Sequence, residues 1–218
     1  MFVGHFGAGL AAKKVNSKIS LGILILAAQF IDLIWPILIL TGIEKVAVEQ
    51  GNTAFTPLNF VSYPFSHSLA AVIGWGLLFG IVYYLFKKDW KGSVLLGLLV
   101  VSHWVLDLIV HRPDLPLVPG SDIKVGLGMW HSVPLTVIFE LAIFAAGIFF
   151  FLKSYKEKDS KFGIRFWSLI IFLTVIYFMN IISPPPPSAK EIGYAGLAMW
   201  VFVLWGFWID KKPNKKNE

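Results

Sequence analysis

The feature that most constrains this chain is a series of six long apolar stretches, separated by shorter polar segments. An α-helix rises about 1.5 Å per residue, so about 20 apolar residues cross the hydrocarbon core of a bilayer. The composition agrees, because 56% of the residues are hydrophobic and only 15% are charged. The sequence therefore predicts an all-α fold, a polytopic membrane helical bundle with six transmembrane helices. These cover residues 19–43, 67–86, 92–111, 131–152, 165–183 and 191–209.

A short apolar segment precedes the first of these spans and ends at Lys13 and Lys14. Residues 1–12 would form a helix of about 18 Å, too short to cross a core of about 30 Å. We therefore expect a half-helix that enters the bundle or lies at its surface. We expect one integral membrane domain over residues 1–218, with the chemically informative part in about 1–152 and two further spans in about 165–209.

The lysines and arginines are distributed unevenly between the two ends of the predicted spans. Cytoplasmic loops of membrane proteins carry an excess of these residues. The pattern therefore predicts a protein of the cell membrane with both termini in the cytoplasm, and it explains the net charge of +6 without a nucleic-acid partner. The basic end has Lys13, Lys14, Lys18, Lys87, Lys88, Lys91, Lys153, Lys156, Lys158, Lys161, Arg165, Lys211, Lys212, Lys215 and Lys216, and the other end has Lys45, Arg112, Lys124 and Lys190.

Three polar side chains interrupt the apolar pattern of the third span at a regular interval. His103, Asp107 and His111 stand at i, i+4 and i+8, within about 80° of one another on one helix face. Ionisable groups inside a membrane are costly unless they are paired or bound. Two imidazoles and a carboxylate suit a divalent metal ion, and the absence of cysteine limits its ligands to His, Asp, Glu or water. A hydrogen bond between His103 and Asp107 without a metal is the alternative.

Further side chains of the same chemistry lie at similar predicted depth: Asp32 in the first span, His67 and His131 at the starts of two others, and His5 in the half-helix. Each could instead be an interfacial histidine or a structural acid. Glu140 lies on nearly the opposite helix face from His131, so we expect a separate buried acid there. The outer loops, 44–66 and 112–130, are long enough to act as lids over the site.

The same residues carry a resemblance to a known family. The motifs Gly4-His5-Phe6-Gly7, Asp32, Ser66-His67-Ser68, His103 with Asp107, and Trp130-His131-Ser132 look like those of the predicted membrane-bound metal-dependent hydrolases, whose ordered His/Asp pattern is similar to that of zinc-dependent phospholipase C. The resemblance covers about residues 1–135.

This resemblance implies a set of metal ligands: His5, Asp32, His67, His103 and Asp107, with His111 and His131 at an accompanying ion. One position departs from the phospholipase pattern, because the acid expected four residues after the last histidine is Leu135. We therefore expect one or two ions, with zinc as the first choice, rather than a cluster of three.

The expected activity is hydrolysis of a phosphoester by metal-activated water, with Asp32 or Asp107 accepting the proton from that water. A site inside the membrane predicts a membrane lipid or lipid-linked, amphiphilic substrate. Two other functions fit the same pattern. In a proton-coupled transporter, Asp32, Asp107 and Glu140 would relay protons. In a haem protein, paired histidines would bind iron, although the neighbouring aspartates argue against this.

Overall fold

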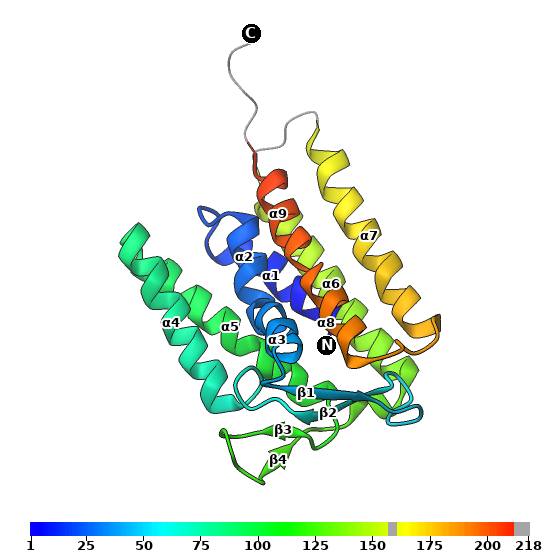
Figure 1. Ribbon diagram of the computed structural model, residues 1–218. Helices are drawn as coiled ribbons and strands as arrows, with labels where there is room; N and C mark the ends of the chain where they lie inside the picture. The colour runs from blue at the N-terminus through cyan, green and yellow to red at the C-terminus, as the bar shows by residue number, and fades with distance from the viewer. Residues whose placement is uncertain (157–160, 212–218) are drawn as a thin grey trace.

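The computed structural model describes residues 1–156 and 161–211, so Lys158, Lys212, Lys215 and Lys216 of the charge pattern lie outside the described residues. Figure 1 shows long helices side by side, with small strands gathered at one end of the bundle. In chain order the elements are α1 (Val3–Val15), α2 (Leu21–Ala28), α3 (Phe30–Leu40), β1 (Lys45–Val48), β2 (Leu58–Ser62), α4 (Leu69–Lys87), α5 (Trp90–Val110), β3 (Leu115–Pro116), β4 (Lys124–Val125), η1 (Met129–His131), α6 (Val133–Ser154), α7 (Phe162–Ile182), α8 (Ala189–Leu197) and α9 (Trp200–Ile209).

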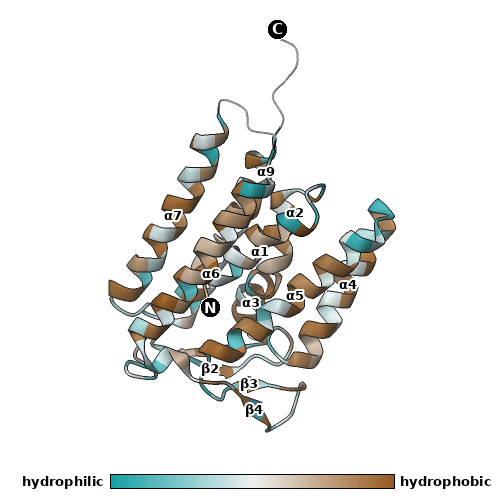
Figure 2. Cartoon of the chain, turned by 180° about the vertical axis from the view of Figure 1, so that it is seen from behind, coloured by the Kyte–Doolittle hydropathy of each residue, from teal (hydrophilic) through white to brown (hydrophobic). Residues whose placement is uncertain are grey.

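The predicted fold class is confirmed. Within the described residues, five helical stretches are long and apolar enough to cross a membrane, and a sixth is obtained when the bent pair α2 and α3 is taken as one span. Figure 2 shows these helices mostly apolar along their lengths. The first span differs from a straight helix, because α2 and α3 meet at Gln29 with a bend of 56°. The last span is continuous in direction but consists of α8 and α9.

The short N-terminal segment forms α1, the expected half-helix, and it lies inside the bundle. Nine of its thirteen residues are buried, and it packs most extensively against α6. Gly7 of α1 and Gly147 of α6 make this approach possible, because a Cβ atom at Gly7 would lie 2.6 Å from the carbonyl oxygen of Ile143. Small residues allow membrane helices to approach closely in this way. The position of α1, and therefore of His5, depends on this contact.

The two long loops of residues 44–66 and 112–130 contain small antiparallel sheets that the all-α prediction does not include. β1 pairs with β2, and β3 pairs with β4. Figure 1 shows both hairpins at the same end of the bundle, beside the ends of α3 and α5. Buried aromatic residues, Phe60 and Tyr63, attach the first hairpin to the helices beneath it. The loops therefore form a structured cover, in agreement with their expected position over the site.

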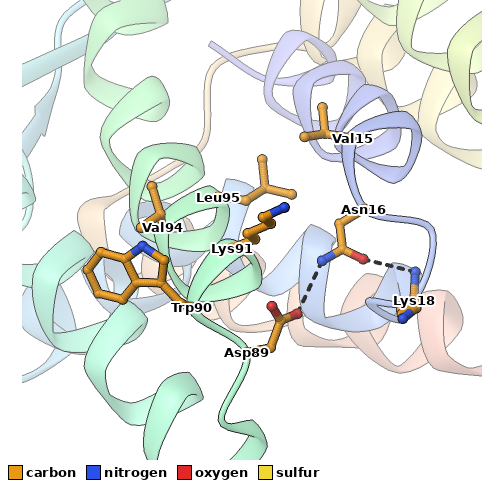
Figure 3. A pocket seen from close by; sticks show the side chains of 8 residues that line it. All are labelled: Val15, Asn16, Lys18, Asp89, Trp90, Lys91, Val94 and Leu95. Atoms are coloured by element: carbon orange, nitrogen blue, oxygen red, sulfur yellow. Dashed lines mark hydrogen bonds between the residues drawn. The ribbon is translucent and has the colours of Figure 1, made fainter.

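The opposite end of the bundle has the turns that carry the lysines. Asn16, between α1 and α2, donates a hydrogen bond of 3.2 Å from Nδ2 to Oδ2 of Asp89, the N-cap of α5 (Figure 3). Nearby, Nζ of the buried Lys13 lies 2.7 Å from the carbonyl oxygen of Ile19 and 3.2 Å from Oδ2 of Asp210. These contacts join α1, α5 and the end of α9, and so fix the polar end of the bundle.

Candidate metal centre

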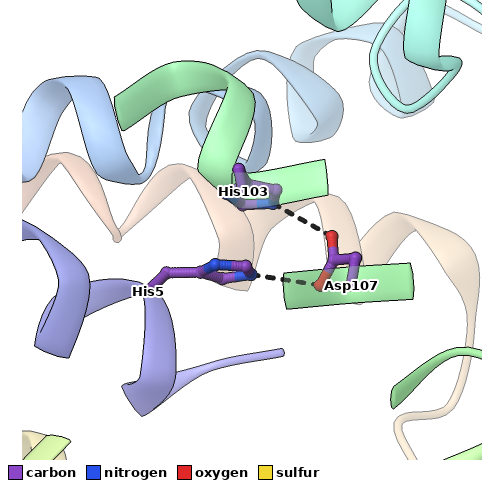
Figure 4. A group of neighbouring side chains, drawn as sticks. All are labelled: His5, His103 and Asp107. Atoms are coloured by element: carbon purple, nitrogen blue, oxygen red, sulfur yellow. Dashed lines mark hydrogen bonds and ion pairs between the residues drawn. The ribbon is translucent and has the colours of Figure 1, made fainter. Parts of the chain in front are cut away.

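Five of the predicted site residues converge from four different segments of the chain: His5 from α1, Asp32 from α3, His67 from the loop before α4, and His103 and Asp107 from α5. They form two overlapping groups of potential metal ligands that share His103. Within each group the ligand atoms lie within 4.8 Å of one another. Figure 4 shows His5, His103 and Asp107, with both imidazoles directed to the carboxylate. We call these five residues the His/Asp cluster.

Asp107 lies at the centre of the cluster, with a different histidine on each carboxylate oxygen. Oδ1 lies 3.1 Å from Nε2 of His5, and Oδ2 lies 3.2 Å from Nε2 of His103. Oδ1 is also 2.6 Å from the amino group of Met1. Asp32 approaches from the other side, with its Oδ1 atom 3.5 Å from Nε2 of His103 and 3.6 Å from Nε2 of His67.

These separations are close to those that a bound metal ion imposes on its ligands. Two atoms that are each about 2.0–2.2 Å from a tetrahedral ion lie about 3.3–3.6 Å from each other. The observed nitrogen–oxygen distances in the cluster run from 3.1 to 3.9 Å. Nitrogen and carboxylate oxygen donors without sulfur also suit zinc and similar divalent ions. The cluster can therefore hold one such ion with only small movements of its side chains.

His103 is held with one ring nitrogen directed into the cluster. Its Nδ1 atom is 2.9 Å from the carbonyl oxygen of Ala28, so Nδ1 donates a hydrogen bond there and Nε2 is the ring nitrogen that faces the carboxylates. Nε2 is fully buried and has no hydrogen-bond partner among the described residues. The ring stacks on His5 at 3.6 Å. A second interaction that fixes the tautomer is typical of a metal-binding histidine.

His67 is oriented by two residues, Ser66 and Glu44, that were not among the predicted metal ligands. Ser66 Oγ lies 2.7 Å from Nδ1 of His67 and donates a hydrogen bond of 2.5 Å to Oε2 of Glu44. The other oxygen of Glu44 accepts the backbone N–H groups of Phe65 and Ser66, each at 2.8 Å. The Ser66-His67-Ser68 motif indicated the serine, but Glu44 lies more than twenty residues earlier, and no local pattern connects it to His67.

The cluster is almost completely buried within the protein. The side chains of His5, His67, His103 and Asp107 are at most 3% exposed, whereas that of Asp32 is 19% exposed. A ligand in this position would be screened from bulk solvent, which strengthens its electrostatic interactions. Asp32 is therefore the member of the cluster that lies nearest to the protein surface.

His111 belongs to a separate polar group between the cluster and the first hairpin. Its Nδ1 atom donates to Oδ1 of Asp114 at 2.9 Å, and the hydroxyl of Tyr63 donates to the same oxygen at 2.8 Å. Burial alone would raise the pKa of Asp114, but these hydrogen bonds and one from Nε of Arg112 hold it below its usual value. The ring of His111 is 6.5 Å from that of His67, so it adjoins the cluster without joining it.

The structure does not bring His131 to the cluster, because it lies in η1 with an exposed side chain. Glu140 is a separate buried acid, as expected, and accepts the backbone N–H groups of Phe2 and Gly4 at 2.9 and 3.3 Å. It therefore holds the first turn of α1, the helix that carries His5.

Comparisons of the chain with models of protein families, with curated proteins and with solved structures found no match.

Proposed function

We propose that the His/Asp cluster binds a divalent metal ion, with zinc as the first choice, and that the protein hydrolyses a phosphoester of a lipid-linked or amphiphilic substrate. The observation that carries the proposal is the convergence of three imidazoles and two carboxylates, from segments far apart in sequence, at ligand-to-ligand distances. Buried groups of this kind are costly unless they are bound or paired. Nε2 of His103 supports the proposal, because it makes no hydrogen bond among the described residues and lies 3.2 and 3.5 Å from carboxylate oxygens of Asp107 and Asp32.

A bound ion of this type lowers the pKa of its water ligand towards about 7 and polarises a phosphoryl oxygen. Among the two carboxylates, Asp32 is the better candidate to accept the proton from that water, because it is partly exposed whereas Asp107 is buried between two histidines. His5, His67 and His103 would hold the ion, and Ser66 with Glu44 would keep His67 in place.

The position of the cluster supports a substrate that reaches it from the membrane. Asp107 is near the end of α5, about 24 Å along that helix from Lys91. The site would then lie in the half of the bilayer that faces the hairpins, close to the level of lipid head groups. A phosphate group on an amphiphilic molecule can reach this depth while its apolar part stays among the exposed faces of the helices.

The first experiment is elemental analysis of the purified protein, with His103→Ala beside a matched control. His131→Ala removes an identical side chain outside the cluster. We expect about one or two equivalents of zinc or a similar ion in the wild type and in His131→Ala, and none in His103→Ala. A wild type without stoichiometric metal, with His103→Ala behaving as the wild type, would overturn the metal proposal and favour a proton-coupled transporter.

The second experiment tests hydrolysis itself. The metal-loaded protein is incubated in mixed micelles with phospholipids and lipid phosphates, and released phosphate or head group is measured. Activity should disappear on chelation, return when the metal is restored, and be absent in His103→Ala. If the protein holds its metal but releases nothing from any phosphoester in the panel, the metal site stands and the phosphoester assignment fails.

We also propose that the lysine-rich end faces the cytoplasm, since cytoplasmic loops are enriched in Lys and Arg. The chain has no native cysteine, so single cysteines report topology directly. Ala54→Cys, between β1 and β2, should react with an impermeant thiol reagent added to intact cells, and Ser17→Cys, between α1 and α2, should not. Both positions are exposed in the structure. The opposite labelling pattern would reverse the orientation.

A further inference from the structure

A groove at the basic end of the bundle lies well away from the His/Asp cluster. It has a cavity volume of about 710 Å³ and lies where the loop after α1 meets the start of α5. This volume is within the range of about 300–1,000 Å³ that small-molecule sites occupy. Figure 3 shows the lining side chains: Val15, Asn16, Lys18, Asp89, Trp90, Lys91, Val94 and Leu95.

The two lysines of this groove are available to an anion. Among the described residues, neither Lys18 nor Lys91 has an ion-pair partner, and both are exposed. The one acid in the groove, Asp89, has both oxygens occupied: Oδ1 accepts the N–H of Gly92 at 3.0 Å, and Oδ2 accepts Nδ2 of Asn16 at 3.2 Å. Asp89 therefore joins the two walls of the groove and, among the described residues, forms no ion pair with either lysine.

The remaining lining is apolar and exposed. Val15, Trp90 and Val94 are 73%, 70% and 41% exposed, directly beside the two lysines. Tryptophan at the end of a membrane helix is typical of the lipid–water interface. A soluble anion would use the lysines and leave these apolar side chains uncovered. A molecule with a phosphate group and hydrocarbon chains would use both parts of the groove.

We infer that this groove binds the head group of an anionic phospholipid, with the phosphate between Lys18 and Lys91 and the acyl chains along Val94 and Trp90. Basic pockets of this kind between membrane helices bind anionic lipids. The site is about 24 Å along α5 from Asp107, so it is distinct from the proposed hydrolytic centre. Its function would be to anchor α1 and α5 at the basic face of the bilayer, and it does not depend on the proposed activity.

The test is lipid binding to the purified protein, measured by native mass spectrometry during titration with phosphatidylglycerol. The double variant Lys18→Gln/Lys91→Gln should weaken the dissociation constant of the tightest site about thirtyfold, given the usual contribution of each lysine. Lys87→Gln/Lys153→Gln removes the same charge at the same end of the bundle but outside the groove, and should retain binding. Lys18→Arg/Lys91→Arg should also retain it, which separates loss of charge from misfolding.

Two further ligands distinguish the source of the phosphate. Phosphatidylcholine carries no net charge and should bind more weakly than phosphatidylglycerol. Glycerol 1-phosphate has no acyl chains and should also bind more weakly. If glycerol 1-phosphate binds as tightly as the lipid, the site is for a soluble phosphate and the lipid assignment is wrong. Equal losses in the groove variant and in the Lys87/Lys153 control variant would show general charge attraction and overturn the proposed site.

Discussion

The two ends of α1 carry buried polar groups of opposite character. Near its end, Lys13 forms a closed network, in which its ammonium group binds Asp210 and the carbonyl oxygen of Ile19, and Asp210 also accepts the N–H of Leu21. Near its start, His5 enters a cluster in which the ring nitrogens Nδ1 of His5 and Nε2 of His103 have no hydrogen-bond partner among the described residues. The first network is complete without a ligand. The second gathers three imidazole rings and two carboxylates around one point, and this difference supports a bound metal ion at the cluster.

The largest effect is expected at the centre of the cluster. Asp107→Asn keeps the shape of the side chain but removes the charge that two histidines face. Because an amide is a poor ligand for such an ion, the variant should lose essentially all bound metal and, with it, all hydrolytic activity. Elemental analysis after gel filtration gives the metal content. Full metal occupancy in this variant would contradict the assignment of Asp107 as a ligand.

The corresponding change in the closed network should affect stability and leave metal binding intact. Asp210→Asn leaves Lys13 buried without its charged partner, and breaking such a pair costs about 3 kcal/mol or more. For a chain of this length we expect the Tm to fall by roughly 6–12 °C, while the folded protein keeps its metal. The double variant Lys13→Met/Asp210→Leu should recover much of the loss, since it removes both charges. If the folded Asp210→Asn variant lost its metal, the conclusion that the Lys13 network is independent of metal binding would be wrong.

A smaller loss of metal affinity is expected when the residues that orient His67 are changed. Ser66→Ala removes the hydroxyl group that contacts Nδ1 of His67, and such changes lower metal affinity about 10–100-fold. Ser68→Ala is the matched control, because the hydroxyl of Ser68 caps α4 through the N–H of Ala71 and donates to the carbonyl oxygen of Pro64 rather than to the imidazole. It should lower stability by about 1 kcal/mol and leave metal affinity unchanged. Competition with a chromophoric chelator measures both affinities, and equal values for both variants would exclude an orienting role for Ser66.

The smallest change is a loss of stability expected in the group around Asp114, which, like the Lys13 network, is held by hydrogen bonds within the protein. Its pKa is held below the usual value by hydrogen bonds from His111, Tyr63 and Arg112 despite burial. A carboxylate whose pKa is lowered by folding contributes stability above its unfolded pKa of about 3.9, and this contribution is lost as the pH falls through the folded value. Asp114→Asn should therefore be less stable than the wild type at pH 7, and the difference should narrow below about pH 4. Thermal unfolding across this range provides the measurement. A difference that stays constant down to pH 3 would show that the charge of Asp114 is not responsible.

For Glu140, the helix pattern predicted the position of the side chain but not its hydrogen-bond partners. Its spacing from His131 predicted an acid outside the cluster, and the structure agrees. Its actual partners, the N–H groups of Phe2 and Gly4, belong to a segment more than 130 residues away, so no local pattern could identify them.

His131 is the opposite case, in which the sequence pattern suggested a ligand but the structure places the residue outside the cluster. It shares a residue type and a predicted depth with the cluster, yet it is the exposed last residue of η1, just before the N-cap of α6.

By itself the sequence determined the membrane-spanning helices, a short helix before them, and the residue types of the cluster. These properties depend on segment length, on apolar composition and on the 3.6-residue period, all of which are local. The tertiary structure decided which of the candidate ligands meet. The bend at Gln29 accompanies the approach of Asp32 to His103, the contact between Gly7 and Gly147 sets the depth of His5, and the hairpin loop brings Glu44 and Ser66 to His67. Distances between helices depend on how side chains pack across them, and the period of a single helix does not specify that packing.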